Sequence, residues 1–294
     1  MVAYIDSPFQ LLLLYFNSVK LHDELSLIIV RYNGNHVNDN GLDEIIAIIA
    51  EKNLVKIKKK SDVKYMLKIV YHLAKSRKVL LGDYRNRVSK IFLKIGFLFK
   101  KIYFIDDGAG TLNLANERIY RSIRQAKNIT FYSIYRLPYL VDYNISLDLS
   151  DFILGGRSLY GLDEYDDFYV SQKFSEAGLF SLDDELKFVR KLSLLSQNMV
   201  IILHRGDSIE KRLKFTDMGI KYIELPLPLE CYFKYLKRDV VIHGISSTCL
   251  YNAHIFGLAV KLYRPDVEVN PLFRKGFLSI LKYYNDEICQ ATVV

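Results

Sequence analysis

The sequence predicts an α/β protein made of two doubly wound, Rossmann-like units. Short apolar runs rich in strand-forming residues alternate with longer stretches of helical apolar spacing, first before residue 112 and again after residue 181. A length of 294 residues fits two domains of about 150 residues each. We therefore expect an N-terminal unit over residues 1–180 and a C-terminal unit over residues 181–294, facing each other across a cleft.

The first unit is expected to open with a strand, a tight turn and a helix. Ser7 and Pro8 mark the helix start, because serine caps helix N-termini and proline fits the first helical position. The alternation then continues to a strand that ends at residue 105. The other expected strands are 2–6, 25–31, 54–57 and 78–82, and the expected helices are 8–21, 42–51, 62–76 and 85–100.

The second unit repeats the alternation after a stretch with weaker signals. Residues 129–137 and 152–154 are candidate strands there, and the acidic run 163–167 indicates a loop between the units. The strands expected beyond it are 198–203, 221–225, 239–242 and 258–262. The expected helices are 182–196, 208–218, 229–236, 247–256 and 273–284.

The amino-acid composition is compatible with several classes of partner and does not choose between them. The net charge is +8 and half of the residues are hydrophobic, so the chain is globular and suits an anionic ligand, an anionic membrane surface or nucleic acid. The basic residues are spread along the chain and form no recognised nucleic-acid motif. Cys231, Cys249 and Cys289 lack metal-ligand spacing, which indicates reduced thiols in a cytoplasmic protein. The N-terminus lacks a signal-peptide pattern, and the apolar run 11–14 is far too short for a bilayer span.

Two adjacent carboxylates follow the strand that ends at residue 105. Asp106 and Asp107 stand at its carboxyl end, where open α/β sheets bind ligands, and Gly108 and Gly110 allow a sharp turn and close approach of a ligand. A carboxylate there is a candidate general base, and the alternative is that it only caps the turn. Neighbouring strand residues point to opposite sides, so we expect one aspartate to be the base, with Asp106 favoured, and the other to organise the turn.

A second strand end carries His204 and Arg205 after the apolar run 201–203. The histidine could donate a proton or a hydrogen bond to a departing phosphate, and the arginine could pair with a carboxylate or phosphate. The alternative is a histidine that caps the next helix beside a surface arginine.

A third strand ends at His243 and Gly244, and Ser246, Ser247 and Thr248 then open a helix. Helix N-termini offer free N–H groups and a favourable dipole to a phosphate, and the three hydroxyls add donors. The alternative, an ordinary serine cap, needs only one of them.

Five short motifs, taken in order, resemble those of a known family. They cover the chain from residue 4 to about residue 262, and only the ordered set is specific. The motifs are Ser7-Pro8-Phe9-Gln10, Asp106-Asp107-Gly108, His204, Pro228-Leu229-Glu230 and Ser246-Ser247. The set resembles the bacterial lipooligosaccharide and capsule sialyltransferases of glycosyltransferase family 52, which are related to the bacterial polysialyltransferases. Members usually carry proline after the histidine, where this chain has Arg205, so His243 stays a competitor for the role of acid.

The resemblance implies a GT-B fold and an inverting, metal-independent sialyltransferase that needs no cofactor beyond its donor substrate, CMP-sialic acid. The implied acceptor is a terminal galactose of a bacterial capsule or lipooligosaccharide glycan. One of the two aspartates would be the base, His204 would stabilise the departing CMP phosphate, and the paired serines would bind that phosphate. The implied substrate-binding residues are Ser7, Gln10, Gly108, Gly110, Arg205, Glu230, His243, Gly244, Ser246, Ser247 and Thr248.

Other interpretations stay open at this point. The alternation alone also fits a single large α/β domain or a periplasmic-binding-type pair. A rival function is a non-catalytic α/β protein that binds an anionic sugar or nucleotide, which needs the serines and cations but no base. We expect no nucleic-acid partner. The lysine-rich helices 62–76 and 85–100 could hold the chain at the inner face of the cell membrane, or their lysines could form an ordinary solvated face, and a homodimer is a further option.

Overall fold

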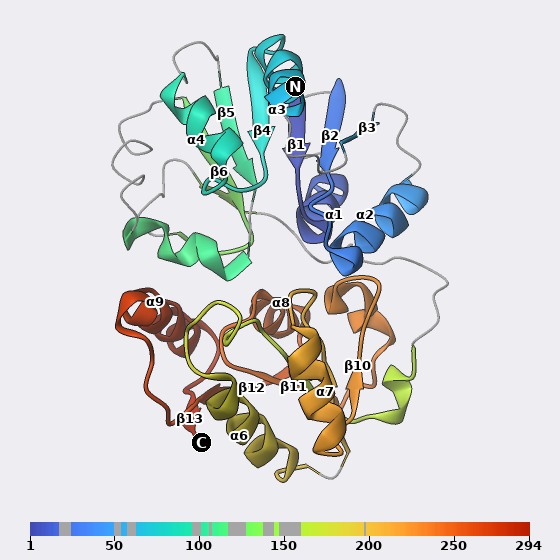
Figure 1. Cartoon of the computed structure of the whole chain (residues 1–294), viewed down its shortest axis with the longest axis vertical. Coiled ribbons are helices and arrows are strands. Elements are labelled where there is room, and N and C mark those ends of the chain that lie inside the picture. Colours follow the sequence, from blue (N-terminus) through green and yellow to red (C-terminus); the bar gives the residue numbers. More distant parts are fainter. Residues whose placement is uncertain are drawn as a thin grey trace. The chain divides into compact units, whose positions relative to one another are not determined.

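The chain forms two compact units, Met1–Phe152 and Ile153–Val294, each built on its own parallel sheet (Figure 1). The computed structural model describes residues 1–17, 25–49, 54–57, 63–95, 101–105, 108–116, 128–137, 144–146, 160–196 and 198–294. The predicted class of two doubly wound α/β units is confirmed. The predicted boundary at residue 180 is corrected, because residues 167–170 form a central strand of the second sheet.

The first sheet has the strand order β3-β2-β1-β4-β5-β6-β7. The chain moves outward from β1 to β3 and returns to β4 on the other side of β1, so the order reverses between β1 and β4. Right-handed crossovers place α1 and α2 on one face and α3 and α4 on the other.

The strands are β1 Val2–Ile5, β2 Leu27–Arg31, β3 Leu54–Ile57, β4 Lys78–Leu81, β5 Lys101–Ile105, β6 Ile129–Ser133 and β7 Asn144–Ser146. The helices are α1 Pro8–Phe16, α2 His36–Ile49, α3 Val63–Ala74, α4 Arg87–Lys94 and the 3₁₀ segment Gly108–Asn116.

The second sheet repeats this winding in the order β10-β9-β8-β11-β12-β13. Its order reverses between β8 and β11, and the crossovers place α6 and α7 on one face and α8 on the other. The strands are β8 Asp167–Val170, β9 Met199–Ile202, β10 Tyr222–Ile223, β11 Val241–Gly244, β12 Ala259–Arg264 and β13 Thr292–Val293. The helices are α6 Leu182–Ser193, α7 Ile209–Asp217, α8 Thr248–Phe256, α9 Pro271–Glu287 and the 3₁₀ segments Leu162–Glu164 and Leu229–Tyr235.

Polar side chains cap the N-termini of helices in both units. Helices α1, α4, α6, α7, α8 and α9 each begin at a serine or asparagine whose side chain accepts a backbone N–H bond. Each of these helices follows a strand, so each cap lies in the connection between that strand and its helix. The caps are Ser7, Asn86, Ser181, Ser208, Ser247 and Asn270.

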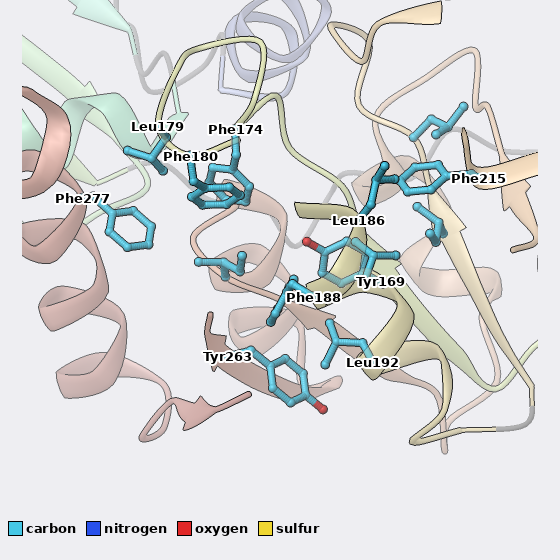
Figure 2. Close-up of a cluster of buried hydrophobic side chains, with 14 of the residues drawn as sticks. Tyr169, Phe174, Leu179, Phe180, Leu186, Phe188, Leu192, Phe215, Tyr263 and Phe277 are labelled. Carbon is cyan, nitrogen blue, oxygen red and sulfur yellow. The ribbon is translucent and has the colours of Figure 1, made fainter. Parts of the chain in front are cut away.

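A cluster of buried aromatic and aliphatic side chains fixes one face of the second sheet (Figure 2). Phe188 of α6 packs edge-on against Tyr169 of β8, with ring centroids 6.1 Å apart. Phe215 of α7 and Phe277 of α9 join the same cluster. Helices α6, α7 and α9 are therefore held against the strands whose carboxyl ends carry the polar loops described below.

Several predicted boundaries need correction. The acidic run ends in strand β8 instead of a loop, and the predicted strand 239–242 is β11, which extends to Gly244, so His243 lies within it. The predicted helix 229–236 is the 3₁₀ segment Leu229–Tyr235, and helix α2 begins at His36. The candidate strand 152–154 lies outside the described residues. None of the described helices is both long and apolar enough to cross a bilayer.

Candidate active site

Three loops meet at the carboxyl edge of the second sheet. They follow β8, β9 and β11, which are neighbours in the order β9-β8-β11 and run parallel. This edge includes the point where the strand order reverses, the usual ligand-binding place of a doubly wound sheet. The structure brings His204, Arg205, Ser246 and Ser247 to this edge, together with Gln172 after β8.

The turn after β9 holds the His204 ring in one orientation. The His204 backbone N–H donates to Asp207 Oδ2 at 2.8 Å, and the Asp207 N–H donates back to the His204 carbonyl at 2.9 Å. The Gly206 N–H donates to His204 Nδ1 at 2.8 Å. Because Nδ1 accepts a hydrogen bond, the proton of the neutral ring is on Nε2, which is then a donor.

His204 is neutral at physiological pH. Burial lowers its pKa from 6.5 to about 4, and the nearby charges of Arg205, Lys173 and Lys211 act in the same direction, while Asp207 partly opposes them. A neutral imidazole with its proton on Nε2 can donate a hydrogen bond to a phosphate oxygen without carrying a charge. A bound phosphate would raise this pKa, because a nearby anion favours the protonated ring.

The turn after β11 presents donors at the N-terminus of α8. Ser247 is the N-cap, and its Oγ accepts the Cys249 N–H at 3.3 Å, so α8 uses one serine as an ordinary cap. Ser246 is buried, and both its N–H and its hydroxyl point to one acceptor outside α8. Thr248 is the first residue of the helix. The Ser246 and Ser247 motif thus divides into one cap and one residue whose donors face the sheet edge.

Gln172 is the residue that sequence reasoning missed at this edge. Its Oε1 accepts from the Ser246 N–H at 3.2 Å and from the Ser246 hydroxyl at 3.3 Å. The acidic run 163–167 predicts a loop, and this hid strand β8, which positions Gln172. The apolar residues 168–170, followed by Ser171 and Gln172, are nevertheless a strand-end pattern like those before His204 and Ser246.

A buried lysine ties two of the three loops together. The Lys211 ammonium, fully buried on α7, donates to the Gln172 carbonyl at 2.7 Å and to Asp207 Oδ1 at 2.8 Å. It also pairs with Glu185 of α6 at 2.5 Å and lies 3.7 Å from Glu176. Burial alone would lower the pKa of Lys211, but the two carboxylates it contacts outweigh burial and raise the pKa, so the lysine is charged.

Glu230 lies in the 3₁₀ turn that packs on α8. Its Oε1 accepts from Asn252 Nδ2 at 2.7 Å, and burial raises the pKa of Glu230, while the charge of Arg205 acts in the opposite direction. Arg205 of the β9 loop is the weakest of the influences on this carboxyl group, after burial and the hydrogen bonds. The predicted contact of Glu230 with substrate stays a prediction.

His243 does not join these loops. Its Nε2 faces Asp167 Oδ1 at 2.5 Å and its Nδ1 faces the Tyr263 hydroxyl at 3.0 Å, both inside the sheet. Both ring nitrogens of His243 therefore have partners within the second unit, one in the first residue of β8 and one in β12. Gly244 has a packing reason, because a Cβ there would stand 3.0 Å from Leu250 of α8. The engaged ring of His243 favours His204 as the acid, and the role of His204 stays a prediction.

In the first unit, Asp106 and Asp107 lie outside the described residues, between β5 and the 3₁₀ segment that follows. Gly108 has a φ of +83°, which favours glycine, so the predicted sharp turn is present at this position. A Cβ on Gly110 would lie 2.5 Å from an Arg85 nitrogen, and the Tyr84 hydroxyl donates to the Gly110 carbonyl at 3.1 Å. Arg85, which sequence reasoning missed, thus packs directly on the glycine turn.

The motif at residues 7–10 has a local structural role. Ser7 caps α1 by accepting the Gln10 N–H at 3.3 Å, and the buried Gln10 side chain accepts the Asp6 N–H at 3.2 Å. Gly82, at the end of β4, lies so close that a Cβ there would stand 2.6 Å from the Gln10 Cδ. Both side chains hold the loop at the point where the first sheet reverses, and their contact with substrate stays a prediction.

Comparisons with known proteins identify the fold. No protein-family model and no curated protein sequence matches the chain. Solved structures do match: the α/β-galactoside α-2,3-sialyltransferase of Photobacterium phosphoreum has 9% sequence identity and a TM-score of 0.60, over 99% of this chain and 97% of that chain. A putative UDP-N-acetylglucosamine 2-epimerase from Listeria monocytogenes has 13% identity and a TM-score of 0.61, over 99% and 90% of the two chains. The GT-B domain of a sialyltransferase from Photobacterium damselae has 9% identity and a TM-score of 0.51, over 100% and 99%.

The fold is GT-B. The matches extend over nearly the whole of both chains in each comparison, so the likeness includes both units. At 9–13% identity the likeness concerns the fold alone, and enzymes with different chemistry share it.

Proposed function

We propose that this protein is an inverting sialyltransferase that moves sialic acid from CMP-sialic acid to a terminal galactose of a bacterial capsule or lipooligosaccharide glycan. We also propose that the chain belongs to glycosyltransferase family 52, which its motifs resemble. It is supported by the ordered motifs of the sequence and by a fold shared with two bacterial sialyltransferases.

The arrangement of His204 and Ser246 carries the proposal. A neutral histidine with its donor proton on Nε2 and a buried serine at the start of α8 occur on two loops of one sheet edge, on either side of the β8 loop. Hydrogen-bond donors and a helix N-terminus are what a leaving nucleotide phosphate needs, because negative charge develops on it as its bond to the sugar breaks. These donors could stabilise the phosphate without a metal ion.

The proposed reaction is a single displacement. One carboxylate, Asp106 or Asp107, takes the proton of the acceptor hydroxyl, and the hydroxyl oxygen forms a bond to the anomeric carbon of sialic acid. The bond from that carbon to the CMP phosphate oxygen breaks on the opposite side, and CMP leaves with the electron pair. His204 and the Ser246 N–H donate hydrogen bonds to the departing phosphate.

A second candidate is a UDP-sugar 2-epimerase. The likeness to the Listeria structure has a TM-score of 0.61, and a shared fold does not choose between the two chemistries. The two candidates differ in the nucleotide they bind and in their need for an acceptor. An epimerase releases no CMP from CMP-sialic acid.

The test is acceptor-dependent release of CMP. We expect the purified protein to release CMP from CMP-sialic acid faster with a panel of galactosides than without, and chromatography to detect a sialylated product. An unchanged rate of CMP release after treatment of the protein with a chelator would support metal independence. Conversion of UDP-N-acetylglucosamine in place of this activity would support the epimerase.

The matched variant for this assay is His204→Gln, compared with His254→Gln on the exposed side of α8. We expect the first to lose most of the transfer and the second to retain it. Tight binding of CMP with no turnover for any galactoside would instead support the non-catalytic binding protein.

A further inference from the structure

The whole net charge of the chain belongs to its first unit. Residues 1–152 contain 23 Lys and Arg against 15 Asp and Glu, a net charge of +8, whereas residues 153–294 contain 18 of each. A non-specific excess of lysine would be shared by both units. The asymmetry therefore indicates a role that belongs to the first unit alone.

Within the first unit, the charge differs between the two faces of the sheet. Helices α3 and α4 on one face contain five Lys and Arg and no Asp or Glu. Helix α2, on the opposite face, contains Asp39, Asp43 and Glu44 and no Lys or Arg. One face is basic and the other acidic.

The cations of α4 form a row on its outer side. Arg87, Lys90 and Lys94 are exposed and are spaced three and four residues apart, so they lie on one side of the helix. Val88 and Phe92 are buried on the other side and attach α4 to the sheet. The row is thus presented outward by a helix that is fixed from behind.

The outer side of α3 adds apolar groups to these cations. Leu67 is 62% exposed and Tyr71 is 56% exposed, four residues apart, although both side chains are large and apolar. The Lys75 ammonium lies 4.2 Å from the centre of the Tyr71 ring. Ile69 and Leu73 are buried and hold the helix on the sheet, where α3 contacts β1. Exposed leucine and tyrosine beside lysine are typical of a helix that lies in a membrane interface.

We propose that the outer sides of α3 and α4 dock this protein on an anionic lipid bilayer. This α3–α4 face consists of Leu67, Tyr71, Lys75, Arg87, Lys90 and Lys94. Lysine and arginine near such a surface each strengthen binding by about a factor of five, and the apolar side chains enter the headgroup region. A bilayer is favoured over nucleic acid because nucleic-acid binding would leave Leu67 without an apolar environment. The inference holds whether or not the proposed function is correct.

Vesicle co-sedimentation tests this inference. The full chain is mixed with vesicles of phosphatidylcholine alone or with about one third phosphatidylglycerol, at low and high salt. We expect binding to the anionic vesicles only, weakening as salt rises. The variant Arg87→Glu/Lys90→Glu/Lys94→Glu should bind at least about 100-fold more weakly. The control Lys187→Glu/Arg190→Glu/Lys191→Glu on α6 makes the same change in charge on the neutral unit and should bind as the wild type does.

A second variant tests the contribution of the exposed apolar side chains to binding, separately from the contribution of charge. Leu67→Ser/Tyr71→Ser leaves the charge unchanged and should still weaken binding to the anionic vesicles. If the glutamate triple variant is unfolded by circular dichroism, Arg87→Gln/Lys90→Gln/Lys94→Gln takes its place. Equal loss in the α4 and α6 triples, or no binding of the wild type, would overturn the inference. Binding to single-stranded RNA without binding to anionic vesicles would overturn it in favour of nucleic acid.

Discussion

Gln172 Oε1 accepts both donors of Ser246, the backbone N–H at 3.2 Å and the hydroxyl at 3.3 Å. The N–H has a single proton, so Ser246 cannot give it fully to a phosphate while Gln172 holds it. In the proposed site, Gln172 therefore competes with the ligand for the Ser246 donors.

Replacing Gln172 by Ala should tighten CMP binding. The ligand-free protein would lose the two Ser246 hydrogen bonds, whereas the complex would lose little, so affinity should rise by about 2- to 10-fold. Isothermal titration calorimetry measures this change. Weaker binding in a variant of normal thermal stability would mean that Gln172 aligns Ser246 for the ligand and does not compete with it.

The double replacement Ser246→Ala/Ser247→Ala should weaken CMP binding by about tenfold without unfolding the protein. Two hydroxyl donors are lost, and the missing cap of α8 costs about 1 kcal/mol of stability. The control is Ser181→Ala, which removes a cap of the same kind from α6. It should cost similar stability and leave CMP affinity unchanged. Unchanged affinity in the double variant would remove these serines from the site.

Asp106→Asn should abolish transfer while leaving thermal stability and CMP binding near normal, if Asp106 is the base. Asp107→Asn should lower both stability and activity, because we assign Asp107 to the backbone of the turn. Steady-state transfer rates and thermal melts of both variants decide the assignment. A folded but inactive Asp107→Asn beside an active Asp106→Asn would reverse it, and two active variants would leave the turn without a base.

Lys211→Met should destabilise the second unit by about 3–5 kcal/mol. It leaves the buried carboxylates of Asp207 and Glu185 without their cation. Urea unfolding measures the loss, and Lys214→Met, at an exposed position of the same helix, is the control. Adding Glu185→Gln to Lys211→Met should recover part of the stability, because one of the two unpaired charges is removed. No recovery would mean that lost packing, and not charge, is the cause.

Stability should fall with pH in a window that His204 defines. The folded pKa of His204 is about 4, below the unfolded value near 6.5, so the unfolded chain takes up a proton that the folded chain refuses. Stability is complete above pH 6.5 and is lost as the pH falls toward 4. Urea unfolding should show the wild type losing on the order of 2 kcal/mol more than His204→Gln between pH 7 and pH 4.5. Parallel losses in the two proteins would assign the effect to other groups.

Local signals predict most of the architecture. Ser7 with Pro8, Ser208 and Ser247 lie next to apolar runs, and each caps the helix that the sequence predicts there. His204 and Ser246 reach one edge of the sheet because parallel strands place their carboxyl ends together, which the alternation alone is enough to predict.

Long-range pairing is what the sequence does not reveal. Asp167 closes an acidic run that predicts a loop, yet it begins a central strand because His243, 76 residues away, and Ser196 bind its carboxylate. The role of Gln172 is hidden for the same reason, since its partner Ser246 is 74 residues away. Lys211 resembles any surface lysine of a helix until Glu185 of another helix is placed beside it.

The contact between Gly82 and Gln10 has an evolutionary consequence. Any side chain at position 82 would occupy the space of the Gln10 amide, and the amide cannot move away without giving up the Asp6 N–H. In related sequences, residues 10 and 82 should therefore change together. A smaller residue at position 10 would permit alanine or serine at position 82, whereas glutamine at position 10 requires glycine.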